Sequence, residues 1–404
     1  MFHGASLRPE PDDLSTAIRI LVSFVTAGAG HRRAAEAIAQ AAAVQFPGAN
    51  IQCRDLLEEV PAWWRRAYPA TYYWLVRRCS FVWGMCFWLL DTWPVYRMVQ
   101  PLRRAWNLVI ARRFVRALRR SPPDVVIVTH FFPADVVSAC KEAGWITTPL
   151  VIVVTDLHPH RLWLAPAADA YVCGADQGAW MAQARGVPAD RLHVLGIPVA
   201  EPFGMVVDRP ARSEPFHLDP NRRTVLVTSG GNTVGPFEAV VKALMARERA
   251  FPGRMQLLVV CGENRAAVQR LGKRAEESAM PVTVLGFIET MPQAMAASDL
   301  IVAKAGGLTV TEALSLGVPL VLYHAIPGQE RVNAEHVARH GAAVIALRPC
   351  DVASVVQDLL EDPARLAAMR NAARRLSRPH AARDIVAKVV APLVHAATQR
   401  KGAA

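Results

Sequence analysis

The chain alternates short runs of apolar, often β-branched residues with longer stretches in which apolar residues recur every three or four positions. The first pattern is typical of buried strands, and the second is typical of amphipathic helices that cover them. Alternation of the two along one chain predicts parallel sheets flanked by helices. Eleven strands are predicted, at residues 18–25, 125–130, 150–156, 170–174, 193–197, 224–228, 256–261, 282–287, 300–304, 319–324 and 342–347.

A proline-rich interval separates the predicted strands into two sets. Residues 198–221 contain five prolines and no sustained apolar period, which is typical of a connection between domains. We therefore expect an α/β protein with two doubly wound, Rossmann-like domains that face each other across a cleft. The expected divisions are a disordered tail (1–16), a first domain (17–205), a linker (206–221), a second domain (222–376) and a C-terminal helix that returns to the first domain (377–404).

Composition adds constraints on the environment and the partners. Of the 404 residues, 52% are hydrophobic and 20% are charged, which excludes wholesale disorder. The 46 lysines and arginines exceed the 34 acidic residues, and the net charge of +12 favours anionic partners. Seven scattered cysteines without a Cys-x-x-Cys pair argue against a disulfide framework and indicate a reducing cytosol. The first 16 residues contain no apolar run, so no secretory signal is expected.

The positive charge is concentrated in residues 61–120, which hold twelve arginines, a single acid (Asp91) and seven of the ten tryptophans. Their longest apolar run, Phe81–Leu90, is too short to span a bilayer as a helix. Packing in the core and stacking on single-stranded nucleic acid are alternatives, but an apolar run flanked by arginines fits a membrane-surface anchor better. The residues expected to meet lipid are Arg77, Arg78, Trp83, Trp88, Arg103 and Arg104.

The loops that follow the predicted strands contain the candidate chemistry. In the first domain, Gly28 and Gly30 permit a tight turn before a helix, and His31 stands at the start of that helix. A histidine there can act as a general base near neutral pH, and the alternative is a residue that only caps the helix. His130 and Asp156 end two further strands and are expected to form a polar wall of an acceptor site.

Asp156 also begins the run Asp156-Leu-His-Pro-His160, which raises the question of a metal. Its spacing matches no standard zinc pattern and further ligands are lacking nearby, so no metal is expected.

The second domain opens with a similar glycine-containing loop that holds Gly230, Gly231 and Asn232. A glycine-containing turn before a helix suits a phosphate, because the first backbone N–H groups of a helix have no partner within it.

A later segment, Lys304-Ala-Gly-Gly-Leu-Thr-Val-Thr-Glu-Ala313, again places two glycines before a helix. Thr309 is expected to cap that helix and to bond a phosphate, and Glu312 is expected to accept two ribose hydroxyls. The alternative is an ordinary capping box between the two residues. Gln329 and Glu330 follow at another loop, where an amide and a carboxylate suit the hydroxyls of a sugar.

Taken in order, these motifs resemble those of the monogalactosyldiacylglycerol synthase and processive diacylglycerol glucosyltransferase family, which is related to the peptidoglycan glycosyltransferase MurG. The resemblance covers about residues 18–375. The similar motifs are Gly28-Ala-Gly-His-Arg32, Thr155-Asp156, Leu195-Gly-Ile-Pro198, Ser229-Gly-Gly231, Val260-Cys-Gly262, Leu285-Gly-Phe287, Lys304-Ala-Gly-Gly-Leu-Thr309, Glu312-Ala313 and Pro327-Gly-Gln-Glu330.

The resemblance implies a glycosyltransferase of the GT-B type that transfers a hexose from a UDP-sugar with inversion, without a metal or other cofactor. It implies that His31 is the base, that Phe287 lies against the uracil, that Glu312 holds the ribose, and that Gln329 and Glu330 read the hexose. The diphosphate would be surrounded by Gly230, Gly231, Gly306, Gly307, Leu308 and Thr309, with Asn232 in the same loop.

The expected reaction is transfer of glucose or galactose to diacylglycerol by a peripheral protein on the cytoplasmic side of the membrane. Anionic lipids of that surface are expected partners, and nucleic acid is not. A MurG-like transfer of N-acetylglucosamine to an undecaprenyl-linked cell-wall precursor is the alternative reaction. A binding module that has lost catalysis is the non-enzymatic alternative, and the presence of both His31 and Glu312 argues against it.

Overall fold

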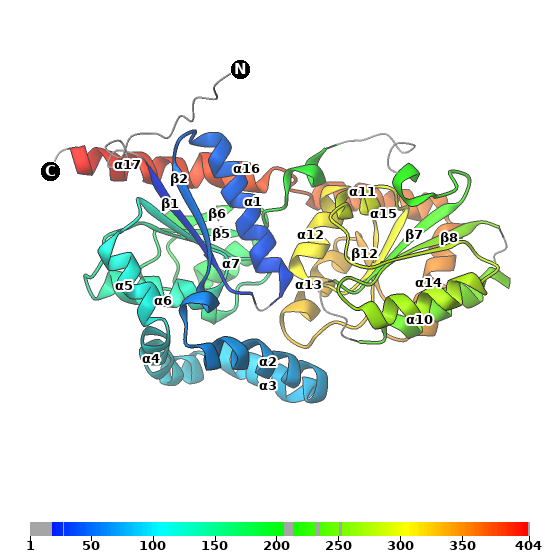
Figure 1. The fold of residues 1–404 in the computed structure, drawn as a ribbon, viewed down its shortest axis with the longest axis horizontal. Helices are drawn as coiled ribbons and strands as arrows, with labels where there is room; N and C mark the ends of the chain where they lie inside the picture. Colours follow the sequence, from blue (N-terminus) through cyan, green and yellow to red (C-terminus); the bar gives the residue numbers. More distant parts are fainter. Residues whose placement is uncertain (1–17, 27, 206–212, 231–234, 250–252, 403–404) are drawn as a thin grey trace, which may run out of the picture.

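Two parallel sheets, one in each half of the chain, organise the molecule (Figure 1). The computed structural model describes residues 18–26, 28–205, 213–230, 235–249 and 253–402. The first sheet has the order β2-β1-β3-β4-β5-β6, and the second has the order β12-β11-β10-β7-β8-β9. The two doubly wound, Rossmann-like domains predicted from the sequence are therefore confirmed.

The strands of the first sheet are β1 (Arg19–Phe24), β2 (Asn50–Asp55), β3 (Val125–Val128), β4 (Leu150–Val153), β5 (Ala170–Cys173) and β6 (Leu192–Val194). Those of the second sheet are β7 (Arg223–Thr228), β8 (Met255–Val260), β9 (Val282–Leu285), β10 (Leu300–Ala303), β11 (Leu320–Leu322) and β12 (Ala343–Ile345).

Helices cover both faces of each sheet. In the first half of the chain they are α1 (Ala29–Gln45), α2 (Ala62–Arg78), α3 (Ser80–Asp91), α4 (Trp93–Ile110), α5 (Arg112–Arg120), α6 (Phe131–Glu142) and α7 (Asp176–Ala184). In the second half they are α9 (Phe237–Met245), α10 (Arg265–Glu276), α11 (Met291–Ala296), α12 (Gly307–Ser315), α13 (Gln329–Arg339), α14 (Pro349–Glu361) and α15 (Pro363–Leu376).

The core follows from the alternation of side chains along the buried strands. In β1, Ile20 and Val22 face α1 and the C-terminal helices, while Leu21 faces the layer that contains α5 and α6. The second sheet alternates in the same way: Leu226 of β7 faces α12 and α15, and Val227 faces α9 and α14. Because consecutive side chains of a strand point to opposite faces, each run of apolar residues supplies two cores at once.

One strand, β2, was not predicted. It lies at the edge of the first sheet and, among the described strands, pairs only with β1, in register from Asn50 opposite Arg19 to Asp55 opposite Phe24. Its residues are exposed or half-buried, and polar side chains alternate with Ile51 and Cys53. An edge strand needs no continuous apolar run, which is why the pattern of buried strands does not find it.

Each sheet has a topological switch point, where the chain leaves in opposite directions from two neighbouring strands. These points lie between β1 and β3 in the first sheet and between β7 and β10 in the second. Ligands of open α/β sheets bind in the crevice at the carboxyl ends of the strands at such points. The loops that carry the candidate residues follow these strands or their neighbours.

The chain returns to the first domain after α15. Helices α16 (Ala381–Ile385) and α17 (Ala391–Gly402), joined by a π-helical stretch (Val386–Val390), run across the first domain (Figure 1). Ile385, Val389 and Val394 pack with α1 and with one face of the first sheet. This part of the chain therefore belongs to the hydrophobic core of the first domain.

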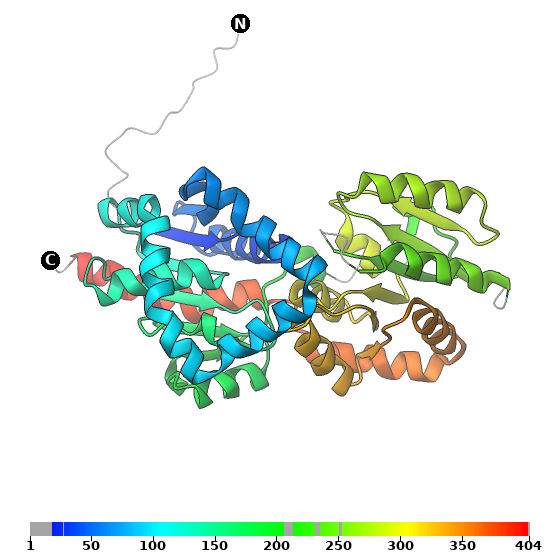
Figure 2. The ribbon, with the colours of Figure 1, turned by 90° about the horizontal axis from the view of Figure 1, so that it is seen from below.

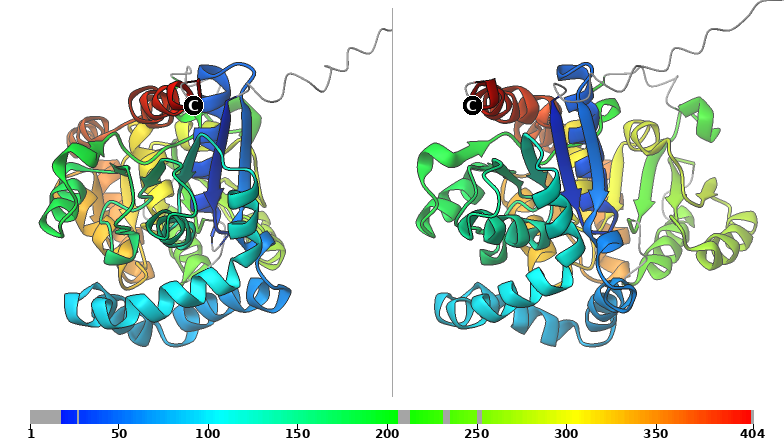
Figure 3. Two further views of the ribbon diagram at one scale, coloured as in Figure 1. Left: turned by 90° about the vertical axis from the view of Figure 1, so that its left-hand side faces the viewer. Right: turned by 60° about the vertical axis from the view of Figure 1, so that its left-hand side comes forward.

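Helices α2, α3 and α4 form a separate layer along one side of the molecule (Figures 2 and 3). The end of this layer where α2 and α3 meet reaches the junction between the domains (Figure 2). None of the described helices is long and apolar enough to cross a bilayer. At least 40% of the residue is exposed at Trp63, Trp74, Phe81, Val82, Met85, Trp88, Leu89, Trp93, Met98, Leu102, Trp106 and Val109, all within this layer.

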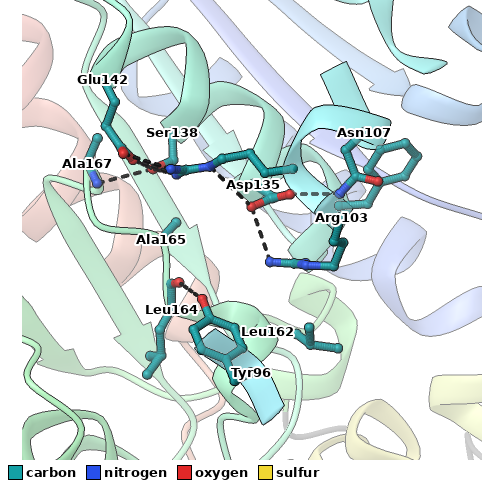
Figure 4. A network of polar contacts seen from close by, with 12 residues as sticks. Tyr96, Arg103, Asn107, Asp135, Ser138, Glu142, Leu162, Leu164, Ala165 and Ala167 are labelled. Atoms are coloured by element: carbon teal, nitrogen blue, oxygen red, sulfur yellow. Dashed lines mark hydrogen bonds and ion pairs between the residues drawn. The ribbon is translucent and has the colours of Figure 1, made fainter. Parts of the chain in front are cut away.

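Arg103 and Arg104 do not belong to the exposed part of this layer, contrary to the sequence-based expectation. Arg103 donates to Asp135 at 3.2 Å (Figure 4). Arg104 pairs with Glu142 at 2.5 Å. Asn107 donates to the second oxygen of Asp135 at 2.7 Å. A charge count cannot reveal such partners, because Asp135 and Glu142 reach these arginines only in the fold. The two arginines join α4 to α6 and are not available to lipid.

Candidate active site

A cavity of about 240 Å³ lies between the two domains. Its walls come from the loop after β1 and the start of α1, from α2, and from the loops after β7, β8, β9 and β10. The carboxyl ends of the two sheets thus face the same space. This is the place at which doubly wound domains bind ligands.

Two helices begin at this cavity, and neither has a side-chain cap. Helix α1 follows Gly28, whose φ of 146° favours glycine, and α12 follows Gly306 in an extended conformation. Gly28, Gly30, Gly306 and Gly307 all line the cavity. Where these glycines line the cavity, the first turns of α1 and α12 present backbone N–H groups that have no partner within the helix. The positive ends of two helix dipoles, one from each domain, lie there as well. Such an arrangement is suited to an anion such as a diphosphate.

Thr309 does not cap α12, which corrects the sequence-based expectation. The helix begins earlier, at Gly307, so Thr309 is its third residue and lines the cavity from within the first turn. The residue at the cap position is Gly306, which has an extended conformation and no side chain that could accept a hydrogen bond. His31 likewise stands inside the first turn of α1, because that helix starts at Ala29.

Glu312 is buried at the cavity wall, with 3% of the residue exposed. Arg33 of α1 approaches it from the other domain, with Nη1 3.7 Å from Oε1. Burial raises the pKa of Glu312 to about 7, and Arg33 partly offsets this effect. A carboxyl group held in this way titrates near neutral pH, and it faces the same space as the two helix ends.

One end of the cavity is apolar. Phe287, which is 55% exposed, lies there with Ile288, Met291 and Met295. A flat aromatic group packs well against such an apolar surface.

The polar end contains Glu330 and Lys304. Glu330 accepts a hydrogen bond from the backbone of Ile326 at 3.0 Å, and its other oxygen lies 3.7 Å from Nζ of Lys304. Gln329 precedes Glu330 at the start of α13, and its buried Oε1 has no hydrogen-bond partner among the described residues. Donors and acceptors therefore converge at this end, as required for binding a group with several hydroxyls.

His31 lies beside the cavity and does not form its wall. Its Nδ1 lies 2.8 Å from the carbonyl oxygen of Thr129 and 2.9 Å from the hydroxyl of Thr155. A carbonyl oxygen only accepts, so the neutral ring carries its proton on Nδ1 and leaves the lone pair on Nε2. Burial lowers the pKa of His31 to about 4, against a smaller opposing effect of the bond to Thr129. The ring is thus held as a neutral proton acceptor.

A series of aromatic rings leads from His31 to the surface formed by α2 and α4. The ring of His130 lies edge-on to His31 at 4.7 Å, and Tyr68 lies 6.4 Å from His130. Trp64 and then Trp106 continue the series at 5.9 and 5.6 Å. Nδ1 of His130 accepts from the backbone of Phe132 and caps α6. His130 therefore supports His31 from behind, in a mainly apolar environment.

Asp156 lies where the domains touch. Its Oδ1 accepts from Asn333 of α13 at 3.4 Å, and the backbone of Leu157 donates to the same asparagine at 3.0 Å. Burial raises the pKa of Asp156 to about 6. Close to it, a Cβ at Gly307 would overlap the carbonyl oxygen of Thr155. Only a glycine at 307 permits this approach, so the cavity is closed on this side by direct contact of the two domains.

Asp156, His158 and His160 do not converge. Nε2 of His160 donates to the carbonyl oxygen of Phe87 at 2.8 Å, and its Nδ1 accepts from the backbone of Leu162. Within the described ranges, no three histidine, cysteine or acidic side chains are placed to hold a metal ion. His160 joins the loop after β4 to the end of α3.

The structure brings together most of the residues singled out in the sequence. Those that line the cavity are Gly28, Gly30, Gly230, Phe287, Gly306, Gly307, Leu308, Thr309, Glu312 and Glu330. Gln329, His31, His130 and Asp156 lie next to it, whereas Gly231 and Asn232 are outside the described residues. Arg77, Arg78 and Trp88 are exposed at the layer of α2 to α4.

Trp83 points inward, which corrects its assignment to the lipid-facing set. It packs with Tyr72, Val76 and Ile326, and its ring lies 5.1 Å from that of Tyr72. Since α3 has one face against the second domain, its apolar residues divide between that contact and the surface. In a helix that is apolar on all sides, the sequence pattern does not show which face packs against the second domain and which face is exposed.

Several charged and aromatic residues of the cavity were not predicted as site residues, among them Arg33, Tyr72, Tyr73 and Lys304. Lys304 stands directly before the glycine pair and could have been found from that position. Arg33 and the two tyrosines belong to helix surfaces, and only the packing of the domains brings them to the cavity.

The fold and cavity define the class of the protein as a GT-B glycosyltransferase fold, with two Rossmann-like domains and a ligand cleft between them. Solved structures with this arrangement include MurG of Acinetobacter baumannii, with a TM-score of 0.58 and 17% identity over 93% of this chain and 99% of that one. The S. aureus MnaA–UDP structure matches with a TM-score of 0.63 and 15% identity over 93% of this chain and 97% of that one.

Sequence comparison identifies the family. Residues 31–199 match the model of monogalactosyldiacylglycerol (MGDG) synthase, and residues 224–387 match the glycosyltransferase family 28 C-terminal domain. Processive diacylglycerol beta-glucosyltransferase of Bacillus cytotoxicus is 30% identical over 308 residues, which are 76% of this chain and 78% of that protein. The protein of the same name from Bacillus cereus is 29% identical over 313 residues, 77% of this chain and 79% of that one. The chain belongs to this family of diacylglycerol glycosyltransferases.

Proposed function

We propose that the protein transfers glucose or galactose from a UDP-sugar to the hydroxyl of diacylglycerol, with inversion at the anomeric carbon. The observation that carries the proposal is the cavity between the domains, where two uncapped helix ends and buried Glu312 lie between an apolar end and a polar end. The cavity thus combines apolar, acidic, anion-binding and polar groups, which suit the base, ribose, diphosphate and hexose of a nucleotide sugar. Membership of the family supports the acceptor.

In this proposal the donor lies along the cavity. Uracil packs at Phe287, and the ribose hydroxyls donate to Glu312. The diphosphate accepts hydrogen bonds from backbone N–H groups in the first turn of α12 and in the loop that contains Gly230. Glu330 and Gln329 bind the hexose hydroxyls. Charge that develops on the departing diphosphate is stabilised by fixed N–H dipoles, so we expect no metal to be required.

The acceptor hydroxyl approaches the anomeric carbon from the side of His31. Nε2 takes the hydroxyl proton while the acceptor oxygen forms its bond to the anomeric carbon, and the bond from that carbon to the diphosphate oxygen breaks. UDP leaves with the electron pair. The bond from Nδ1 to the carbonyl of Thr129 holds the ring in position and stabilises the imidazolium that forms.

A product assay tests the function. Purified protein is incubated with diacylglycerol in anionic liposomes and with UDP-glucose, UDP-galactose or UDP-N-acetylglucosamine in separate reactions, and lipids are identified by mass spectrometry. A monohexosyl or dihexosyl diacylglycerol with one of the hexose donors is expected, and it identifies the sugar. Absence of any hexosyl lipid, together with transfer of N-acetylglucosamine to an undecaprenyl-linked precursor, would replace this proposal with the cell-wall reaction.

The layer of α2 to α4 supports a peripheral position on an anionic membrane surface. Its exposed tryptophans and aliphatic residues form an apolar surface, and exposed arginines such as Arg77 and Arg78 accompany them. Tryptophan partitions to the headgroup region, and each cationic residue near an anionic surface adds about 1 kcal/mol of attraction. The aromatic series that ends at Trp106 offers the acceptor an apolar path from this surface toward His31.

Replacing both Arg77 and Arg78 with alanine is expected to weaken binding to phosphatidylglycerol-containing liposomes by about 25-fold, since each contributes about fivefold. Cosedimentation measures the partition coefficient, and neutral phosphatidylcholine liposomes should show little change. The matched control replaces Arg265 and Arg274, two exposed arginines of α10 in the second domain. Equal losses in the two double variants would mean that net charge, and not this surface, controls binding.

A further inference from the structure

Helix α2 forms part of the donor cavity, although it belongs to the layer that we assign to the membrane surface. Tyr72, Tyr73 and Val76, all within its last two turns, line the cavity together with residues of the second domain. Tyr73 lies under the guanidinium of Arg77, with 5.9 Å between that group and the ring centroid. Tyr72 packs with Val76 and Ile326, and the backbone of Ile326 donates to Glu330.

The surroundings of the Tyr72 hydroxyl are the groups assigned to the hexose. Burial raises its pKa above the usual value, and the carboxylates of Glu330 and Asp156 raise it further, whereas the side-chain amide of Gln329 lowers it. These residues come from both domains. Asp156 is held by Asn333, and Glu330 is held by Ile326 and Lys304. The tyrosine hydroxyl therefore lies among fixed polar groups. The amide oxygen of Gln329 nearby has no hydrogen-bond partner within the part of the chain that the structure describes.

Helix α3 packs directly against the loop that carries these groups. A Cβ at Gly84 would lie 2.7 Å from Cβ of Pro327, and Gly328, with a φ of 105°, is covered by the ring of Phe87. Val76, Trp83 and Ile326 form a small buried contact beside them. Helices α2 and α3 and the loop of Ile326 to Glu330 are thus packed as one unit.

We propose that Tyr72 contacts the donor hexose, and that the packing of α3 on the Pro327 loop positions this contact. The inference rests on the proposed function and deepens it, because it assigns to the surface helices a share in recognition of the sugar. Tyr72 contributes a hydroxyl that can both donate and accept, which complements the carboxylate of Glu330 and the amide of Gln329. A UDP molecule without the hexose does not reach this hydroxyl.

The test compares UDP with UDP-hexose in the Tyr72→Phe variant. Phenylalanine keeps the ring that packs on Trp83 and removes only the hydroxyl. Titration calorimetry is expected to give a UDP affinity within twofold of the unsubstituted protein. The affinity for the UDP-hexose that serves as donor should fall by about 5- to 10-fold, the loss of one hydrogen bond. Tyr96→Phe is the matched control, because its buried hydroxyl donates to Leu164 at 3.2 Å, in the layer of α4 away from the cavity.

A second variant, Gly84→Ala, tests the positioning by α3. The added methyl group must push α3 from Pro327, so UDP-hexose binding should weaken while UDP binding remains. Gly272→Ala in α10 is its control, because a Cβ there meets open space. Equal loss of UDP and UDP-hexose affinity in Tyr72→Phe, or unchanged affinity for both, overturns the inference.

The product assay separates the inference from the proposed function. Formation of a hexosyl lipid by the unsubstituted protein, with no effect of Tyr72→Phe on UDP-hexose, refutes the inference alone. Selective weakening of UDP-hexose in Tyr72→Phe without any lipid product refutes the acceptor and leaves the sugar contact standing. A chain that binds no UDP-hexose at all refutes both.

Discussion

Replacing His31 with alanine is expected to lower kcat for hexosyl transfer by about 10³-fold, the effect of losing a positioned general base. UDP affinity should remain within twofold, because His31 lies beside the donor cavity and makes no part of its wall. Single-turnover transfer to diacylglycerol and calorimetry with UDP measure the two quantities. The alanine also leaves the Thr129 carbonyl and the Thr155 hydroxyl without their common partner, so circular dichroism serves as the folding control.

The pH profile of the unsubstituted protein gives an independent check on this role. A base is active in its unprotonated form, and the pKa of about 4 keeps His31 neutral throughout the range from pH 8 to pH 5. No decline of kcat attributable to His31 is therefore expected across that range. Undiminished kcat in His31→Ala would remove the histidine from the mechanism and direct attention to Asp156, a carboxyl group of the first domain beside the cavity.

Replacing Glu312 with alanine is expected to weaken UDP binding by about 20- to 100-fold, since hydrogen bonds to a charged group are worth about 1.5–3 kcal/mol. The reason is that a buried carboxylate accepts both ribose hydroxyls in the proposed complex. Affinities for UDP and for uracil, measured by calorimetry, separate the ribose from the base. Loss of uracil binding to the same extent would show that the cavity itself has collapsed.

Glu312 also predicts a pH dependence of donor binding. Its pKa of about 7 lies above the usual value of a glutamate, so the carboxyl is ionised at pH 8 and largely protonated at pH 6. The ribose binds to the ionised form of Glu312, so below pH 7 the carboxyl group must release a proton before the donor binds. The affinity for the donor should therefore fall by up to about tenfold per pH unit in that range. The KM for the donor rises between pH 8 and pH 6 while kcat stays level. Glu312→Gln should abolish this dependence, and a dependence that persists in it would assign the titration to another group.

The buried parts of the fold could be predicted from the sequence because burial leaves a clear pattern. Strands such as β3 and β10 are continuous apolar runs, and their ends differ from the predicted ends by a few residues only. The loops after them could be predicted to carry the site, because the carboxyl ends of parallel strands share one edge. Strand β2 could not, since an edge strand is paired on one side and keeps a polar face.

The errors concern residues whose role depends on distant partners. Local composition groups Arg103 and Trp83 with the surface. In the fold, Arg103 donates a hydrogen bond to Asp135, and Trp83 packs against Ile326. Tyr72 was missed for the converse reason. Nothing in the sequence of α2 indicates that one of its faces meets the loop of Pro327, which lies about 250 residues further along the chain. Tertiary packing of surface helices is set by such remote contacts, and local patterns do not record them.

The return of the chain to the first domain through α16 and α17 has a mechanical consequence. The chain passes between the domains twice, after β6 and after α15, and the two passages touch: Gly196 packs against Arg378, and Gly204 packs against Pro379. Two adjacent crossings define one rotation axis and suppress independent swivelling of the domains. Helices α2 and α3 touch the second domain on the side of the molecule away from α16 and α17 (Figure 1). They therefore lie far from this axis, and a rotation about it displaces the contact between Gly84 and Pro327.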